Sequence, residues 1–155
     1  MRRLRTQGGF TIVEIMIIVT IIGVLVALIV PSVRVNTVRV KMSEAILAFG
    51  PCRNAVSEIY QGGGDPPADG NWGCETTNPT QYVSQVKVDE IGKITISLRN
   101  FGMGQIDTRD LTLQPLDNTG AIPNGNGSPV TRWRCGSALD DTQIPAQYLP
   151  STCRG

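Results

Sequence analysis

The chain has 155 residues, which is room for one ordinary domain, and 41% of them are hydrophobic. It has no histidine, so the commonest acid/base side chain is absent. The formal net charge of +1 falls to −2 without Arg2, Arg3 and Arg5, because 11 basic residues then face 13 acidic ones. Composition therefore disfavours a histidine-dependent enzyme and a protein with bulk affinity for nucleic acid.

An apolar run occupies residues 10–30, where Glu14 is the only charged residue. At about 1.5 Å per residue, a helix of this length crosses the ~30 Å hydrocarbon core of a bilayer. The run predicts a transmembrane helix over residues 10–30. Arginines before it favour a cytoplasmic N-terminus, and cysteines after it favour an oxidising compartment such as the bacterial periplasm. Both indications give the same topology.

The basic stretch that precedes the run differs from an ordinary secretory signal. Residues 1–7 lead directly into Gly8 and Gly9, and no small-residue cleavage site follows the apolar run. If a segment is removed, we expect it to be residues 1–9. The alternative is an uncleaved signal anchor, in which the two glycines are only a flexible lead-in.

The residues at this junction carry a family resemblance. Gly9, Phe10 and Glu14, followed by an apolar helix with Gly23 and Pro31, resemble the N-termini of type IV pilins and their pseudopilin relatives. The resemblance implies that a prepilin peptidase cuts between Gly9 and Phe10 and then N-methylates Phe10. It also implies that Glu14 is required for assembly.

Glu14 lies about 6 Å along the helix axis from Phe10, near the interface, where a charge costs less than at the bilayer centre. We expect its carboxylate to neutralise the α-amino group of Phe10 on the same or a neighbouring subunit once the helix has left lipid. The alternative is a snorkelling glutamate without a partner. Pro31 lacks a backbone donor and is expected to kink the helix. The resemblance implies that the segment from Gly23 to Pro31 loses helicity in assembled filaments.

Apolar residues continue at helical spacing beyond Pro31 and predict an amphipathic helix over residues 31–60. Its apolar stripe consists of Val35, Val38, Met42, Ala45, Ile46, Phe49, Cys52, Val56, Ile59 and Tyr60. Pro51 falls inside the pattern and is expected to bend the helix, and the glycines and prolines of residues 62–67 end it.

Four basic residues lie on the rest of this helix: Arg34, Arg39, Lys41 and Arg53. Spaced charges of this kind usually form a solvated face or pair with acidic neighbours, here Glu44 and Glu58. DNA binding is possible but has no further support in the sequence.

Residues 61–155 predict a globular head. A loop over residues 61–80 is followed by alternating patterns at residues 82–88, 93–98, 110–116 and 130–135, with a turn at 89–92 and Pro115 ending the third strand. The economical architecture is α+β, with the long N-terminal helix packed on a four-stranded antiparallel sheet, as in the pilin fold.

Four cysteines allow three pairings. Cys52–Cys74 and Cys135–Cys153 would each close a local loop of about 20 residues, worth about 3 kcal/mol in the chain-entropy model. Zinc binding is disfavoured because no paired short spacing occurs, and residues 117–129 lack the calcium-loop pattern. We therefore expect no metal or cofactor. The region from Trp133 to the tail resembles the disulfide-bounded C-terminal region of major type IVa pilins.

The resemblance implies a major pilin precursor, stored in the inner membrane with its head in the periplasm and polymerised into an extracellular fimbrium for attachment, twitching motility or DNA uptake. The implied partners are further copies of the chain, prepilin peptidase, the assembly platform, its ATPases and the secretin. A type II secretion pseudopilin or a minor pilin is the alternative. A membrane-anchored enzyme has no motif in its favour.

Overall fold

The computed structural model of the 155-residue chain describes residues 9–78, 80–124 and 128–155, without the side chains of residues 30–32. Residues 1–8, most of the expected leader, lie outside the described part. The chain divides into two compact units, Met1–Val35 and Asn36–Gly155.

The first unit contains the N-terminal part of helix α1, which runs over Ile12–Leu47. Its window Ile12–Ile29 has a mean hydropathy of 3.1, and 0% of the window is buried. By length and composition this helix is a candidate membrane span. A helical segment that is apolar on all sides except for Glu14 and Thr20, and that has no covered face, requires lipid or other protein around it.

The helical part of the second unit is interrupted once. Helix α1 ends at Leu47, and α2 runs over Gly50–Gly62. Between them, the N–H groups of Ala48 and Phe49 each bond to the carbonyl three residues earlier, at 3.1 Å. Pro51 lies in the first turn of α2, where no intrahelical donor is needed. The helix expected over residues 31–60, with a bend at Pro51, is interrupted just before that proline, where α1 ends and α2 begins.

The predicted apolar stripe is confirmed. The residues that it buries are Val38, Met42, Ala45, Phe49, Cys52, Val56 and Tyr60. Helix α2 stops where expected, with Gly63 in the left-handed region at φ 70°. This buried stripe is the face that packs on the sheet.

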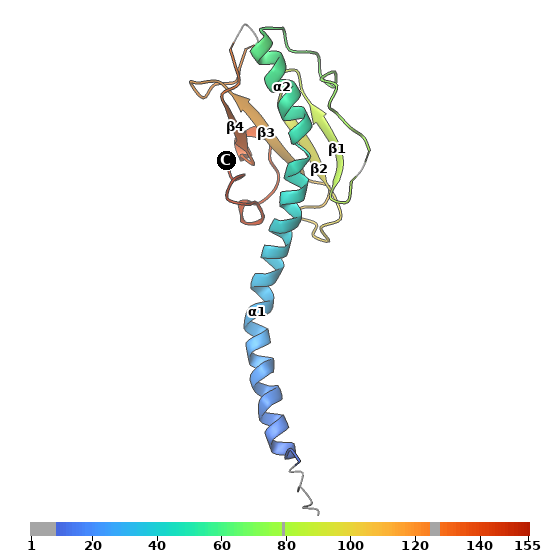
Figure 1. The fold of residues 1–155 in the computed structure, drawn as a ribbon, viewed down its shortest axis with the longest axis vertical. Coiled ribbons are helices and arrows are strands. Elements are labelled where there is room, and N and C mark those ends of the chain that lie inside the picture. Colours follow the sequence, from blue (N-terminus) through green and yellow to red (C-terminus); the bar gives the residue numbers. More distant parts are fainter. Residues whose placement is uncertain (1–8, 79, 125–127) are drawn as a thin grey trace, which may run out of the picture. The chain divides into compact units, whose positions relative to one another are not determined.

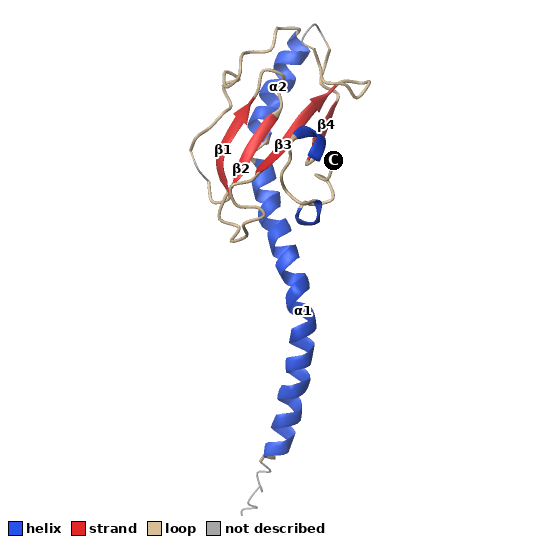
Figure 2. Ribbon diagram, turned by 180° about the vertical axis from the view of Figure 1, so that it is seen from behind, coloured by secondary structure: helices blue, strands red, loops and turns tan. Residues whose placement is uncertain are grey.

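The head contains one antiparallel sheet in the order β1-β2-β3-β4. Its strands are β1 (Val83–Val88), β2 (Ile94–Leu98), β3 (Asp110–Leu116) and β4 (Arg132–Cys135). Helix α2 lies across one face of the sheet (Figures 1 and 2). A Cβ at Gly92, in the β1–β2 turn, would lie 2.9 Å from Val56 Cγ1, so helix and turn are in close contact. The predicted α+β architecture is confirmed.

Pro115 does not end β3 as expected, since it pairs with Trp133 and the strand continues to Leu116. The N–H of Thr131 donates to the Leu116 carbonyl at 2.9 Å, which directs the polar groups of Leu116 towards β4. The nitrogen of Pro115 therefore faces the β2 side, where pairing has already ended at Leu113. No ladder hydrogen bond is lost at the proline.

The sheet face opposite α2 is covered over β3. Thr112 and Gln114 point to this face and are buried, at 1% and 2% exposure. The 3-10 helix η1 (Ala138–Asp140) belongs to the segment that covers them, and the hydroxyls of Thr112 and Thr142 lie 2.6 Å apart. Both faces of β3 are thus buried.

Candidate functional site

The predicted processing site lies in an open segment of the first unit. A Cβ at Gly9 would have no neighbour within 4 Å, and the side chain of Phe10 is 76% exposed. A peptide bond in such a setting is accessible to a protease.

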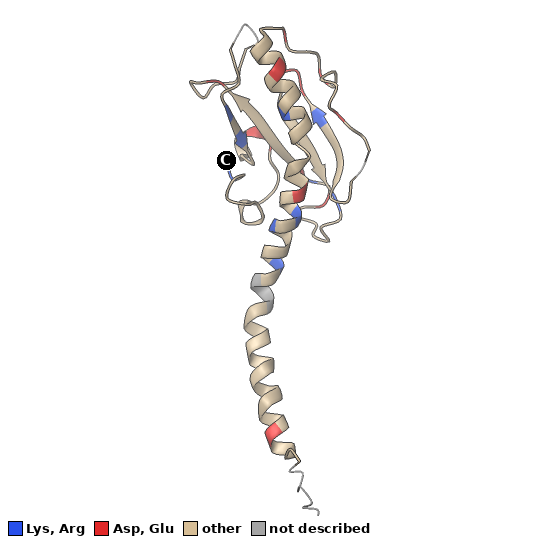
Figure 3. Cartoon of the chain, in the orientation of Figure 1, with Lys and Arg blue, Asp and Glu red and all other residues tan. Residues whose placement is uncertain are grey.

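Glu14 lies in the first turn of α1, where the helix dipole favours a negative charge. Its backbone N–H donates to Thr11 Oγ1 at 3.3 Å, which caps the helix. Figure 3 shows α1 without other charged residues over its described part up to Ile29. Within the part of the chain that the structure describes, the Glu14 carboxylate forms no ion pair. The Thr-x-x-Glu spacing is a capping-box signal that could have identified Thr11 from the sequence.

The remaining predicted assembly residues, Gly23 and Pro31, fall within the bounds of α1. A Cβ at Gly23 would meet nothing within 4 Å, and the side chain of Pro31 is outside the described part. Helix α1 continues without interruption through Pro31. Thr20, the third polar residue of the run after Thr11 and Glu14, donates to the Met16 and Ile17 carbonyls at 3.1 and 2.8 Å, so its hydroxyl is satisfied without water.

Two disulfides each close a loop in the head. Cys52–Cys74 joins the first turn of α2 to the loop after that helix, and Cys135–Cys153 joins the end of β4 to the C-terminal tail. Of the three possible pairings of the four cysteines, the structure has the one that closes two local loops. A Cβ at Gly136 would overlap the Cys153 carbonyl oxygen and lie 2.7 Å from Leu149 Cδ1, so only glycine fits beside the second disulfide.

The segment between Cys135 and Cys153 is fixed by two ion pairs. Arg134 binds the buried Asp140 in a bidentate pair, with N···O distances of 2.7 and 2.5 Å. Lys93 binds Asp141 at 2.9 Å. Hydrogen bonding to the aspartates raises the pKa of both Arg134 and Lys93. Both cations therefore stay charged, and η1 is tied to the sheet on each side.

Three of the basic helix residues contact the head. Arg39 Nε donates to the Gln147 carbonyl at 2.9 Å, Lys41 Nζ lies 5.5 Å from the Tyr82 ring centroid, and Arg53 lies 5.8 Å from that of Trp133. Across the described ranges, none of them pairs with Glu44 or Glu58. These contacts orient the helix surface against its own head.

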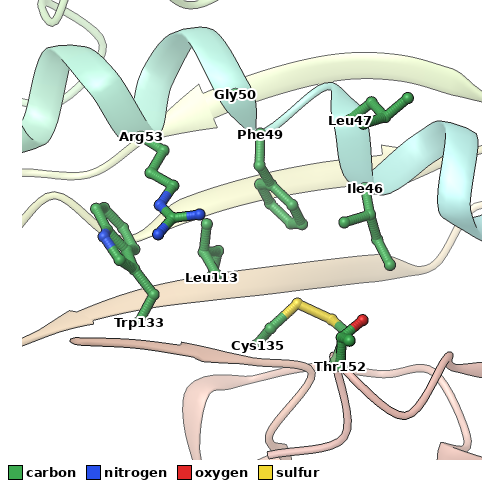
Figure 4. Close-up of a pocket in the computed structure, with 10 residues that line it drawn as sticks. Ile46, Leu47, Phe49, Gly50, Arg53, Leu113, Trp133, Cys135 and Thr152 are labelled. Carbon is green, nitrogen blue, oxygen red and sulfur yellow. A yellow bond between two sulfur atoms is a disulfide. The ribbon is translucent and has the colours of Figure 1, made fainter.

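A groove of about 390 Å³ lies where α1 ends and α2 begins, beside β4 (Figure 4). Its lining comes from four separate stretches: Ile46, Leu47, Phe49, Gly50 and Arg53 at the α1–α2 junction; Leu113 on β3; Trp133 and Cys135 on β4; Thr152 and Cys153 in the tail. Sequence reasoning missed this groove because no local pattern unites these stretches. Among the described residues, no cluster of three or more Cys, Asp or Glu side chains could hold a metal ion.

An apolar helical segment whose side chains are exposed and which carries one acidic residue, joined to a disulfide-bounded α+β head, fits a membrane-associated subunit. Two family models match the chain: the pilin model (bacterial filament) over residues 38–154 and the prokaryotic N-terminal methylation motif over residues 4–30. The chain therefore belongs to the pilin family, whose members are structural subunits of bacterial filaments rather than enzymes.

Named relatives agree with this assignment. The chain is 33% identical to a type IV major pilin protein PilE1 of Neisseria gonorrhoeae, over 96% of this chain and 87% of that protein. It is 34% identical to the fimbrial protein EcpC of Eikenella corrodens, over 97% and 92%. A fimbrial protein of Pseudomonas aeruginosa is 25% identical, over 97% and 98%.

Proposed function

We propose that this chain is the precursor of a major type IV pilus subunit, which loses residues 1–9 and polymerises through its N-terminal helix. The observation that carries this proposal is the helix window Ile12–Ile29, of which 0% is buried. Such a surface is stable in a bilayer before assembly and, after the subunit leaves lipid, only when other helices cover it. The head contributes the outer part of the fibre.

Cleavage between Gly9 and Phe10 creates a new α-amino group four residues before Glu14, directly before the Thr11 cap. When helices replace lipid, the Glu14 carboxylate neutralises that N-methylated amine on its own chain or a neighbour. An uncompensated charge in such a setting costs about 3–5 kcal/mol, so only a register that pairs the two groups is stable. The residues from Gly23 to Pro31 lose helicity in the fibre and lengthen the subunit.

The proposed topology has a cytoplasmic N-terminus and a periplasmic head. The arginines of the leader favour this orientation, and both disulfides require an oxidising compartment. Prepilin peptidase would act on the cytoplasmic side, and the assembly platform, its ATPases and the secretin would extrude the fibre. Attachment, twitching motility and DNA uptake are the candidate uses of the fibre.

A pseudopilin or minor pilin is the second candidate, since either would share the leader and the helix. The major subunit is favoured by the disulfide-bounded C-terminal region and by the likeness to a protein named as a type IV major pilin. Abundance in sheared fibres separates the two: a major subunit is the main protein of long extracellular fibres, whereas a pseudopilin is absent from them.

The proposal is tested by mass spectrometry of fibres sheared from cells, together with Glu14→Ala and a matched control, Thr20→Val. The mature protein should begin at N-methylated Phe10. Glu14→Ala should leave a folded, oxidised subunit in the membrane and no fibres, while Thr20→Val should assemble. A mature chain that retains Met1, or normal fibres from Glu14→Ala, would contradict the proposal.

A further inference from the structure

One apolar side chain of the head, outside the long helices, is almost wholly exposed to solvent. In the described part of Asn36–Gly155, the large apolar residues classed as exposed are Val40, Leu47, Ile122 and Leu139. Leu139 is the most exposed of them, at 86%. Ile122, at 46%, is the only other one outside helix α1.

The backbone at Leu139 is held in place by its neighbours. Leu139 is the middle residue of η1, whose N-cap Ser137 accepts a hydrogen bond from the Leu139 N–H at 3.2 Å. The next two residues form the ion pairs with Arg134 and Lys93 described above. A backbone segment fixed in this way loses little further entropy when the side chain that it carries binds, which is the property of a preorganised contact.

The groove at the α1–α2 junction is a suitable receptor for such a side chain. Phe49 and Leu113, which are 3% and 6% exposed, line it together with Leu47, which is 75% exposed. Arg53 lies over the Trp133 ring at its side and makes no ion pair within the described ranges. An apolar groove flanked by a cation accepts an apolar side chain that has a carboxylate next to it.

Leu139 has that carboxylate. Asp141, two residues on, keeps 81% of its side chain exposed although it binds Lys93. Charge and apolarity are therefore complementary between the η1 surface and the groove.

The two surfaces lie on opposite sides of the sheet, so a chain cannot insert Leu139 into its own groove. Leu113 and Trp133 point to the α2 side, whereas Thr112 and Arg134, the neighbours of η1, point to the other side. A contact between two different patches is heterologous, and repetition of such a contact builds an open helical assembly.

We propose that, in the filament, Leu139 of one copy inserts into the groove formed by Leu47, Phe49 and Trp133 of a neighbouring copy. This inference rests on the proposed function, because it requires polymerised heads. It adds a head-to-head contact to the helix packing that drives polymerisation.

The direct test is disulfide trapping in fibres sheared from cells that express Leu139→Cys with Leu47→Cys. Non-reducing electrophoresis should show a ladder of dimers, trimers and longer oligomers that collapses with reductant. Each single variant, and Leu139→Cys with Ile122→Cys, should give no ladder. Intact fibres of the first double variant without a ladder would overturn the contact.

A second variant measures the contribution of the side chain. Leu139→Ser should leave the melting temperature of the subunit unchanged, since the residue is exposed, but should weaken each contact about tenfold or more and make fibres shed subunits in mild detergent. Ile122→Ser is the matched control and should behave as wild type. Equal fibre stability in both variants contradicts the contact alone, whereas absence of wild-type fibres contradicts the proposed function as well.

Discussion

From Ile12 to Ile29 the chain exposes every side chain, whereas between Asn36 and Gly155 it buries a continuous apolar core. Met42, Val56, Ile94 and Leu111 are each 0% exposed. The head therefore satisfies its own hydrophobic surface within one copy. The N-terminal helix has similar residues but leaves them to be covered by lipid or by other copies, so its packing energy is reserved for assembly.

The largest effect in the head should come from Gly136→Ala. The new Cβ overlaps the Cys153 carbonyl, and the backbone is left-handed at φ 72°, so the disulfide loop must move. We expect a loss of roughly 4 kcal/mol or more in the free energy of unfolding, measured by denaturant titration in detergent. Gly73→Ala, at φ 74° with nothing within 4 Å, should cost only about 1–2 kcal/mol. Equal losses would show that crowding at Gly136 is unimportant.

Two leucine substitutions, one in the core of the head and one in the N-terminal helix, should differ clearly in their effect on unfolding. Leu111→Ala removes a side chain that is 0% exposed and should destabilise the head by about 3 kcal/mol through lost burial and a cavity. Leu25→Ala acts on a residue that is 54% exposed and should change the melting of the head by less than about 0.5 kcal/mol. A large effect of Leu25→Ala on unfolding in detergent would break the division between the two regions.

Removal of the first disulfide should have a somewhat smaller effect. Cys52→Ser with Cys74→Ser opens a loop whose ends are 22 residues apart and should cost about 2–3 kcal/mol. The unfolding midpoint of the oxidised wild-type subunit is the reference, and the variant should no longer respond to reductant at this site. An unchanged midpoint would mean that α2 and its following loop are held together by packing alone.

The smallest effect is a pH dependence in the head. Burial raises the pKa of Asp89 above its ordinary value of 3.8, although the N–H groups of Lys93 and Ile91 act in the opposite direction. The folded state therefore binds this proton more tightly than the unfolded chain, and the carboxyl destabilises the head as pH rises from 3.8 through the raised pKa.

Asp89→Asn should remove that loss and keep the oxygen that accepts the two N–H groups. The variant should gain stability relative to wild type as pH rises through this window, measured by urea unfolding at a series of pH values. A difference between variant and wild type that does not change with pH would contradict the raised pKa.

Periodicity predicted most of the fold. The buried stripe from Val38 to Tyr60 and the four alternating strands could be predicted, because the spacing of residues along a helix or strand determines which face each side chain occupies. The disturbance expected at Pro51 falls slightly earlier, at Ala48 and Phe49, because the proline lies in the first turn of a new helix rather than inside a continuous one. The covered outer face of β3 escaped prediction, because alternation assigns Thr112 to solvent and the segment that buries it is distant in sequence.

Among the candidate site residues, too, only those that belong to a local sequence motif could be selected from the sequence. Gly9, Phe10 and Glu14 lie within six consecutive residues, so a local motif sufficed to select them, and Thr11 belongs to the same pattern. The groove beside Trp133 is assembled from two helices, two strands and the tail, so it exists only in the folded head. The sequence pattern likewise contains no partner for Glu14. The partner that we expect is the α-amino group of Phe10, which exists only after cleavage.

The disulfide Cys52–Cys74 also affects how the head responds to proteases. It encloses most of α2 and the first part of the loop after it, including the exposed Gly62 and Gly63 where the helix ends. A single cut in this interval leaves both pieces covalently joined, and the sheet and the buried stripe keep them in register. Cys135–Cys153 protects the C-terminal segment in the same way. A nicked subunit would therefore remain part of the polymer, and damage at its surface would not shorten the fibre.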